Sequence, residues 1–355
     1  MKKLRLLVLW ALLQCQAVFA LSTGVPPSEA PYRIGVLYWS MSIPGQVAMR
    51  NGLEAEAVRI NSDAPLLGER GVELLTRVAG DGEAGIENQI RQMYELVRAK
   101  VDLIVVQPTD NAALARPLQA ANRAGIPVVA YDQYIRGGHL VSYITSDNYQ
   151  AGYLDGEYVA SRFADEQRIR IVLVEYPHVS STVERADGFV EALHDQGQAF
   201  DIVATYNAVE PESGHAAGKA ILKDFPDSNS VDVVFTVNDG GGLSVVDELA
   251  AAGRDEIIVA SIDGDPRAVK RIKEGSLIHI DSAQFCGPMG ELALRIGYNF
   301  LRGESVPSVV LIPVFPVAVE TVSRFSSWHG PLPASFTKPW VSKQPRWDGQ
   351  LRLNE

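Results

Sequence analysis

The sequence has little cysteine, and after its first 20 residues it has no long apolar run. Of the two cysteines among 355 residues, Cys15 lies in an N-terminal stretch that we expect to be removed, which leaves Cys286. A single thiol cannot form an internal disulfide, so the hydrophobic core has to stabilise the fold. We expect Cys286 to be a small buried hydrophobic residue of that core. No later segment approaches the ~20 apolar residues that a membrane-spanning helix requires.

Basic blocks and catalytic motifs are also missing. The chain carries 43 Asp and Glu against 32 Lys and Arg, which gives a formal net charge of −11, and it has no long run of Lys or Arg. Such a balance argues against binding to a nucleic-acid backbone. There is no G-x-S-x-G or H-E-x-x-H motif, and the six histidines include no pair at metal-ligand spacing. We therefore expect no enzymatic activity, no metal and no cofactor.

The first 20 residues have the pattern of a secretory signal peptide. Basic residues within the first five positions precede the apolar run Leu6–Leu13, and a small residue follows at Ala20. The apolar run is too short to span a bilayer. We expect cleavage after Ala20 and export of a soluble protein. The residues before Cys15 are a poor context for lipidation.

Strand-like and helix-like segments alternate along the rest of the chain. Runs typical of strands are found at Arg33–Tyr38, Val72–Val78, Leu103–Val106, Pro127–Tyr131, Ile169–Val174, Val231–Thr236, Glu256–Ser261 and Leu277–Ile280. Helical patterns lie between them, at Val47–Ile60, Ile86–Arg98, Ala112–Ala124, Gln150–Phe163, Val183–Gln196, Gly214–Asp224 and Leu243–Ala252. This order predicts an α/β protein with parallel sheets covered by helices on both faces. So many strands favour two Rossmann-like lobes, and from about Trp328 the lack of periodicity predicts a tail lying on the surface.

Two glycine-rich segments resemble phosphate-binding loops but lack the partners that such loops need. Gly80–Gly85 matches G-x-G-x-x-G between a strand and a helix, yet no acidic residue ends the next strand. Asn238–Gly242 is followed by no Lys, and we expect Asp239 to cap the helix that begins there. Ser180–Thr182 with Glu184 is interpreted as the cap of another helix. We interpret neither glycine segment as a nucleotide or phosphate site.

Polar side chains follow several predicted strands, at the edge where open α/β sheets bind ligands. They are found at Trp39-Ser40, Gln107–Asp110, Asp132-Gln133, Asn238-Asp239 and Asp263–Asp265. Amides and carboxylates hydrogen-bond hydroxyl groups well, because Asp accepts and Asn and Gln both accept and donate. Asp132 and Asp263 could face each other as an acid–base pair or as the two jaws of a sugar clamp, and the neighbouring amides favour the clamp. Asp110 is interpreted as a turn residue or helix cap.

Seven segments together resemble a known family. In chain order they are QPTDNAAL, IPVVAYDQ, ITSDNYQAG, TVERADGFVEAL, VVFTVNDGGGLSVVDEL, ASIDGDPRAVKRIKEGSL and IDSAQ. They look like the type I periplasmic binding proteins of the ribose-binding class, from about Tyr32 to about Val319. The resemblance implies two Rossmann-like lobes joined by three crossings, with a ligand cleft that closes like a hinge. The implied lobes are 31–146 with 285–313 and 147–284 with 314–330, followed by a C-terminal tail, 331–355.

The resemblance also implies a set of ligand contacts. By position they fall on Gln107, Asp132, Gln133, Asn148, Arg185, Asn238, Asp263 and Gln284. The chain departs from ribose binders at Gln107, where they have Asn, and at Gln133, where the family has Arg. Their two stacking Phe residues are missing from Ile43–Gln46, while Tyr38 and Trp39 stand earlier. We expect Trp39 and Gln46 to line the cleft, since aromatic faces stack on sugars. These departures point away from ribose itself and are compatible with another polyol-like ligand.

The function implied is that of a periplasmic solute-binding protein. It would capture a sugar-like small molecule by hinge closure and deliver it to the permease of an ABC importer, acting as a monomer without a cofactor. The alternative is a periplasmic ligand-sensing subunit for a membrane histidine kinase or chemoreceptor. The long tail is similar to that of relatives that bind a signal molecule and dock on a sensor kinase.

Overall fold

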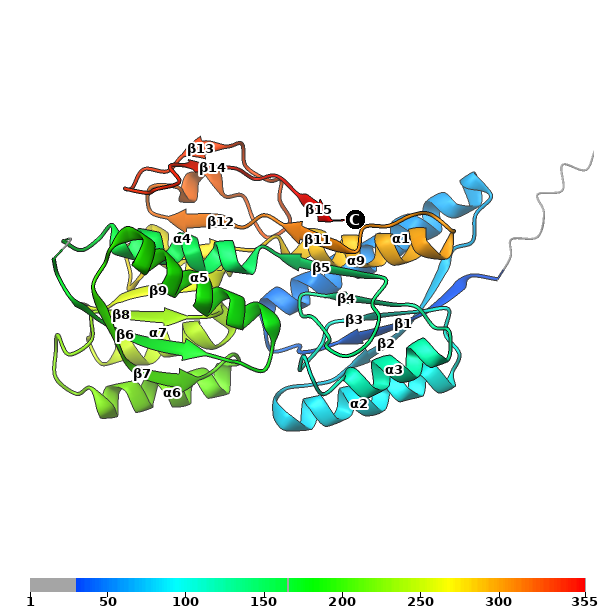
Figure 1. Cartoon of the computed structure of the whole chain (residues 1–355), viewed down its shortest axis with the longest axis horizontal. Helices are drawn as coiled ribbons and strands as arrows, with labels where there is room; N and C mark the ends of the chain where they lie inside the picture. The colour runs from blue at the N-terminus through cyan, green and yellow to red at the C-terminus, as the bar shows by residue number, and fades with distance from the viewer. Residues whose placement is uncertain (1–29, 165, 355) are drawn as a thin grey trace, which may run out of the picture.

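The computed structural model describes residues 30–164 and 166–354. The predicted signal peptide, 1–20, and Cys15 lie outside the described residues. Within the described part of the chain, no helix is both long enough and apolar enough to cross a membrane. These residues form two lobes, each a sheet covered by helices on both faces (Figure 1).

The first lobe is built on a sheet with the strand order β15-β11-β5-β4-β3-β1-β2, parallel apart from β15. Its strands are β1 (Tyr32–Tyr38), β2 (Val72–Val78), β3 (Leu103–Val106), β4 (Val128–Tyr131), β5 (Ser142–Ser146), β11 (Val309–Ile312) and β15 (Arg352–Asn354). One face is covered by α1 (Pro44–Leu67) and α9 (Cys286–Leu301), and the other by α2 (Gly82–Arg98) and α3 (Ala115–Arg123). Because helices cover both faces, β3 and β4 are apolar and buried throughout.

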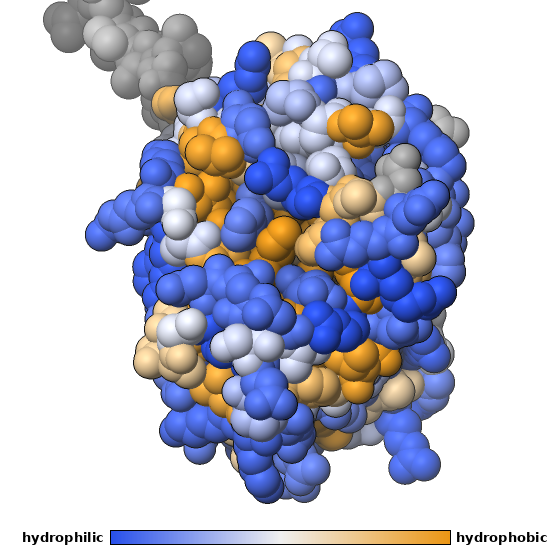
Figure 2. Space-filling view, turned by 90° about the vertical axis from the view of Figure 1, so that its left-hand side faces the viewer, coloured by the Kyte–Doolittle hydropathy of each residue, from blue (hydrophilic) through white to orange (hydrophobic). Residues whose placement is uncertain are grey.

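The second lobe has the strand order β12-β10-β9-β8-β6-β7, parallel apart from β12. Its strands are β6 (Ile169–Glu175), β7 (Phe200–Asn207), β8 (Val233–Thr236), β9 (Ile258–Asp263), β10 (Ile278–Ala283) and β12 (Phe315–Ala318). Its helices are α4 (Asn148–Ala160) packed on α5 (Ser180–Gln196), α6 (Pro211–Asp224) packed on α7 (Asp239–Ala251), and α8 (Pro266–Glu274) between β9 and β10. The outer end of this lobe is mostly hydrophilic, with apolar residues scattered over it (Figure 2).

The two sheets share one connection order, which places the candidate site. The orders β2-β1-β3-β4-β5 and β7-β6-β8-β9-β10 both reverse direction beside their first strand. Open α/β sheets bind ligands at the carboxyl ends of the strands next to such a reversal. The carboxyl ends of both sheets face the boundary between the lobes, so this boundary is the expected place for a ligand.

The chain passes between the lobes at the three predicted crossings and once more in its tail. The predicted crossings lie between β5 and α4, between β10 and α9, and between β11 and β12. After β12 and a short 3-10 helix (Val322–Arg324), residues 328–354 run back over the molecule and end in β15, which pairs with β11 of the first sheet. We call residues 328–354 the tail strap. Figure 1 shows it in orange and red above both lobes.

One anchor of the tail strap is Glu157 on α4 of the second lobe. Glu157 is fully buried, and its carboxylate forms an ion pair with the buried Lys338. Trp340 Nε1 donates to its Oε1 at 2.8 Å, and Ser342 Oγ donates to its Oε2 at 2.7 Å. The expectation of a tail that merely lies on the surface is therefore wrong, because this part of the tail satisfies a buried charge of the second lobe.

The other anchors of the tail strap lie at the crossings. The hairpin β13 (Phe336–Thr337) and β14 (Arg346–Trp347) places the Trp347 ring 5.1 Å from Phe315. Trp347 Nε1 donates to the carbonyl of Val314, in the β11–β12 crossing, at 2.8 Å. Arg352 in β15 forms an ion pair with Asp147, in the β5–α4 crossing. The periodicity of the sequence could not predict β13, β14 and β15, because strands of two or three residues are defined only by the strands with which they pair.

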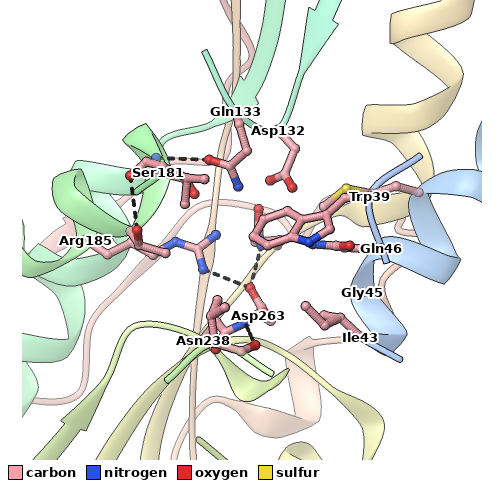
Figure 3. A pocket seen from close by; sticks show the side chains of 15 residues that line it. Trp39, Ile43, Gly45, Gln46, Asp132, Gln133, Ser181, Arg185, Asn238 and Asp263 are labelled. Carbon is pink, nitrogen blue, oxygen red and sulfur yellow. Dashed lines mark hydrogen bonds and ion pairs between the residues drawn. The ribbon is translucent and has the colours of Figure 1, made fainter. Parts of the chain in front are cut away.

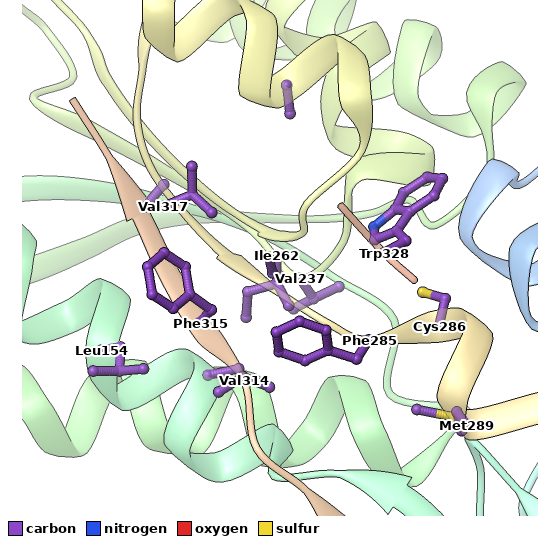
Figure 4. Packing of buried hydrophobic residues seen from close by; sticks show 14 of the residues in the cluster. Leu154, Val237, Ile262, Phe285, Cys286, Met289, Val314, Phe315, Val317 and Trp328 are labelled. Atoms are coloured by element: carbon purple, nitrogen blue, oxygen red, sulfur yellow. The ribbon is translucent and has the colours of Figure 1, made fainter. Parts of the chain in front are cut away.

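The hydrophobic core continues from the second sheet to the base of the cleft. Phe285, Phe315 and Trp328 are buried together where α9 begins (Figure 4). Trp328 Nε1 donates to the main-chain carbonyl of Asp263 at 2.6 Å, which ties the core to the end of β9. Cys286 is fully buried in this cluster, as the sequence predicted.

Candidate ligand-binding site

A pocket with about 350 Å³ of empty space, part of it open to solvent, lies at the boundary between the two lobes (Figure 3). Both lobes contribute to its wall. The lining residues are Trp39, Ile43, Gly45, Gln46, Met49, Asp132, Gln133, Val179, Ser181, Thr182, Arg185, Val209, Asn238, Asp263 and Gln284.

Asp132 is the carboxylate that the first lobe contributes. It follows β4 and is 3% exposed, with a φ of 65°, a left-handed conformation in which Asp and Asn are enriched. Its main-chain carbonyl accepts from Tyr143 Oη at 3.2 Å and from Thr145 Oγ1 at 3.0 Å. Gln107 Nε2 donates to its Oδ2 at 2.8 Å. The turn and one carboxylate oxygen are thus fixed by neutral groups of the same lobe.

Asp263 is the carboxylate that the second lobe contributes. It ends β9 with a φ of 136°, a conformation that side-chain-bearing residues rarely adopt. Its Oδ1 accepts from Arg185 Nη1 at 3.0 Å and from Gln284 Nε2 at 2.5 Å. Arg185 Nη1 also donates to the carbonyl of Val237 at 2.8 Å. Arg185 and Asp263 therefore form an ion pair in which both side chains are buried, and this pair is part of the cavity wall.

Close packing of α4 on α5 places Arg185. A Cβ added to Gly152 of α4 would overlap the carbonyl oxygen of Arg185, so the two helices approach closely only because Gly152 has no side chain. Asn148, at the start of α4, accepts from Arg185 Nε through its Oδ1 at 2.9 Å. The guanidinium is thus held in place by Asn148, which lies outside the cavity lining, without a ligand.

Burial dominates the electrostatics of both carboxylates. It raises the pKa of Asp132, although Gln107 and the charge of Arg185 oppose the rise. It also raises the pKa of Asp263 to about 6, against the lowering effect of Arg185. The site holds two carboxylates and one guanidinium, so it disfavours anionic ligands and favours groups that donate hydrogen bonds.

Aromatic and aliphatic side chains complete the wall. Trp39 is 2% exposed and lines the cavity together with Ile43 and Met49 of the first lobe. Across the boundary its ring lies 6.2 Å from that of Tyr176. Tyr38 does not line the cavity, since its hydroxyl donates to Glu54 on α1 at 3.3 Å.

The structure brings most of the predicted contact residues to the cavity and places two of them behind it. Gln107 and Asn148 are buried and absent from the lining. Gln107 instead supports Asp132 and accepts from the main-chain N–H of Trp39 at 3.3 Å. The expectation that Gln107 faces the cleft is therefore wrong. The predicted residues on the lining are Trp39, Gln46, Asp132, Gln133, Arg185, Asn238, Asp263 and Gln284.

Ser181 and Thr182 also line the cavity, although the sequence predicts them as part of a helix cap. No side chain caps α5. Instead, Ser180 Oγ accepts from the main-chain N–H of Tyr134, and the N–H of Ser181 donates to Gln133 Oε1 at 3.2 Å, both across the lobe boundary. No described residue hydrogen-bonds the buried hydroxyl of Ser181. The sequence feature that could have predicted their place in the lining is their position just after β6, next to the reversal point of the second sheet.

Two other cap predictions had different outcomes. The cap of α7 is Asn238, whose Oδ1 accepts from Gly241 N at 3.1 Å, and not Asp239. Asp239 points instead toward the end of β9, where it accepts from Ser261. Asp110 caps a turn as predicted, since its Oδ1 accepts from two following N–H groups at 2.7 Å.

The lobes touch each other around the cavity, so the structure is a closed form. The Gly82 N–H at the start of α2 donates to Glu210 Oε1 of the second lobe at 3.0 Å. The first glycine-rich segment thus contacts a carboxylate rather than offering a free phosphate site. Trp39 packs with Val179 and Val209 in a small apolar cluster across the same boundary.

Comparison with known proteins agrees with this architecture. Residues 34–305 match the family model described as a periplasmic binding protein domain. The chain belongs to this family. Within it the chain is of type I and ribose-binding-like, as the sequence motifs predicted. It is 26% identical to the ribose import binding protein RbsB of Escherichia coli K12 over 307 residues, covering 86% of this chain and 95% of the relative.

Two further relatives have other ligands in their descriptions. The D-ribose/D-allose-binding protein of Pseudomonas aeruginosa is 25% identical over 311 residues, covering 85% of this chain and 92% of the relative. Among solved structures, the Caulobacter myo-inositol binding protein bound to myo-inositol superposes with a TM-score of 0.73 at 25% identity. That match covers 85% of this chain and 98% of the solved chain.

Proposed function

We propose that this protein binds a neutral sugar or cyclic polyol in the periplasm and delivers it to an ABC importer. The cavity between the lobes carries the proposal, because hydrogen-bonding groups from both lobes converge on it beside an aromatic face. The names of its relatives support the same ligand class, since they refer to ribose, allose and myo-inositol.

The polar groups of the cavity suit a ligand with hydroxyl groups. Asp132 and Asp263 accept hydrogen bonds, Arg185 donates them, and the free hydroxyl of Ser181 does either. A hydroxyl that donates to Asp132 would compensate a buried carboxylate that pairs with no cation among the described residues of its own lobe. The face of Trp39 is placed to cover the C–H groups of a ring. A sugar phosphate would instead add negative charge beside two carboxylates.

Capture requires no chemical step. A ligand that touches both lobes stabilises the closed form by its higher affinity for that form, and the importer recognises the closed surface. Hydrogen bonds between Gln133 and Ser181 and between Gly82 and Glu210 join the two lobes, and separation of the lobes would break them. The role is one of binding and not of catalysis.

A thermal-shift panel tests the ligand class. It contains D-ribose, D-allose and myo-inositol, the phosphate ester of one of these sugars, and a polyamine. We expect one or a few neutral compounds to raise the unfolding temperature, because a ligand at 100 times its Kd stabilises the native state by about 2.7 kcal/mol. Stabilisation by the phosphate ester or the polyamine alone would contradict the proposal. Mass spectrometry of material that co-purifies with the protein gives an independent identification.

The importer role has its own test. We expect the neighbouring genes to encode a transport ATPase and a permease, and uptake of the identified ligand to require this protein. A neighbouring sensor kinase, with normal uptake in a strain that lacks the protein, would contradict the importer role and leave ligand binding intact.

A further inference from the structure

The glycine-rich turn before α2 does not line the cavity, although its sequence resembles a phosphate-binding loop. Gly80 and Gly82 have φ values of 92° and 63°, and a Cβ added to Gly85 would lie 2.0 Å from the carbonyl oxygen of Gly80. The turn is therefore so tight that it depends on glycine at these positions. It leads into the start of a helix, where main-chain N–H groups favour an anionic acceptor.

The N-cap residue of α2 does not cap this helix with its side chain. Asp81 occupies the N-cap position but makes no side-chain hydrogen bond to the helix. Its Oδ2 instead accepts from Ser42 Oγ at 2.5 Å. The first N–H groups of a helix have no partner within the helix, so an acceptor from elsewhere can satisfy them.

Glu210 of the second lobe provides such an acceptor. Its Oε1 accepts from the N–H of Gly82 at 3.0 Å. Glu210 also caps its own helix, α6, in a capping box with Ser213. Figure 1 shows α2 and α6 on either side of the lobe boundary. One carboxylate therefore lies at the amino ends of two helices from different lobes, and separation of the lobes would remove it from α2.

The hydrogen bond from Gly82 favours a carboxylate that its other surroundings disfavour. Partial burial raises the pKa of Glu210, the hydrogen bond from Gly82 lowers it, and the nearby carboxylates of Asp81 and Glu212 raise it further. Both segments that meet here are acidic, so attraction between opposite side-chain charges does not join them. The main-chain donor at the start of α2 is what joins Glu210 to the first lobe.

We propose that Glu210 acts as a latch that stabilises the closed form and so raises the affinity for the ligand without touching it. Neither Glu210 nor Gly82 lines the cavity, so the latch acts through the position of the lobes. A ligand that binds the closed form loses affinity when that form becomes less populated. The effect on affinity rests on the proposed function, whereas the effect on lobe closure requires no ligand.

Glu210→Ser separates the two roles of this carboxylate. Ser is a good N-cap residue, so the variant should keep α6 capped, but its side chain is too short to reach Gly82. Glu210→Gln keeps the length of the side chain and an acceptor for Gly82. Glu212→Ser, at an exposed position of the same helix, is the matched control, because it removes an equal charge.

Distances between spin labels test the latch without a ligand. The labels are placed by Glu87→Cys on α2 and Ala216→Cys on α6, in the protein without its expected signal peptide, where Cys286 is fully buried. We expect a short and a long distance, with the closed-to-open ratio about fivefold lower in Glu210→Ser, the factor that corresponds to a lost helix cap. Glu210→Gln should lose less, and Glu212→Ser should match the wild type.

Three results would overturn the latch. They are a single long distance in the wild type, equal populations in the wild type and Glu210→Ser, and an equal fall in Glu212→Ser. The first would show that the lobes do not close without a ligand. The second would show that Glu210 does not affect closure, and the third would assign the effect to charge alone.

Binding kinetics test the effect on affinity, with D-ribose, D-allose and myo-inositol as probes. Because the ligand leaves only after the lobes separate, Glu210→Ser should weaken binding by up to about fivefold, mainly through faster dissociation. Wild-type affinity and dissociation rate in Glu210→Ser would contradict the link between the latch and the ligand. If no probe binds the wild type, it is the proposed ligand class that fails, and the label distances still decide the latch.

Discussion

The cleft and the tail strap lie at the same lobe boundary, but their buried polar groups are partnered differently. At the tail strap, Glu157 has an ion pair with Lys338 and accepts from Trp340 and Ser342, so both of its oxygens are satisfied within the chain. In the cleft, the hydroxyl of Ser181 has no hydrogen-bond partner among the described residues, and Asp132 has no cation from its own lobe.

This difference indicates which buried groups contribute to the stability of the fold and which contribute to the affinity for a ligand. A buried group that the chain satisfies completely stabilises the fold, and removing its partner is costly. A buried group that is only partly satisfied costs folding free energy but binds a ligand that completes it. Substitutions at the tail strap should therefore change stability, while substitutions in the cleft should change binding.

The largest effect is expected at the tail strap. Lys338→Met leaves the buried Glu157 carboxylate without its cation and should lower the free energy of unfolding by about 3–5 kcal/mol. Chemical denaturation measures the loss. Lys343→Met, at an exposed position of the same segment, is the control and should change stability by less than about 0.5 kcal/mol. Equal losses in both variants would show that Glu157 does not depend on Lys338.

The next effect concerns pH and Asp263. Its folded-state pKa of about 6 lies above the usual value of 3.8, so between these pH values the native state binds more protons than the unfolded state. Its contribution to the free energy of unfolding therefore falls as pH rises through this window, by up to about 3 kcal/mol. Denaturation of the ligand-free protein from pH 4 to pH 7 should show a smaller fall in Asp263→Asn. The same slope in both proteins would argue against a raised pKa.

Asp132→Asn should separate binding from stability in the cleft. The change keeps the shape and the acceptor for Gln107, and Asn tolerates the left-handed backbone. Loss of a hydrogen bond to a charged group, about 1.5–3 kcal/mol, should weaken binding of the stabilising sugar or polyol by about 10- to 150-fold. We expect stability to be unchanged or higher. Calorimetric titration measures the affinity. Asp187→Asn, on an exposed part of α5, is the control. Wild-type affinity in Asp132→Asn would exclude Asp132 as a ligand contact.

The smallest effect is expected from removing the last strand of the tail strap. A chain that ends at Gly349 loses β15 and the partly exposed ion pair between Arg352 and Asp147. Exposed pairs contribute at most about 1 kcal/mol, so the open form should gain no more than about fivefold in population. Small-angle scattering of the ligand-free protein should report a slightly larger radius of gyration. No change relative to the full chain would show that β15 does not restrain opening.

Much of the fold and part of the site could be read from the sequence. Continuous apolar runs such as Leu103–Val106 indicated buried parallel strands, and the structure has β3 at those residues. Asp132 and Asp263 were found because polar residues just after parallel strands meet at one edge of the sheet. The helix predicted at Ala112–Ala124 begins later, at Ala115, because Asp110 holds the preceding residues in a turn.

Other features depend on contacts between distant segments. Gln107 follows a strand as Asp132 does, but its side chain turns back to support Asp132. Asp281 is one polar residue within a strand, and only the fold places its side chain against the N–H of Gly264. No local pattern distinguishes such residues from the ones that face the ligand.

The sequence by itself determined the alternation of strands and helices, the family resemblance and the positions of the two cleft carboxylates. These follow from local periodicity and from the geometry that every parallel sheet shares. The tertiary structure alone decided which polar groups are satisfied by the chain and which remain free for a ligand. The physical reason is that hydrogen-bond satisfaction and burial are set by neighbours far apart in sequence, such as Glu157 and Lys338.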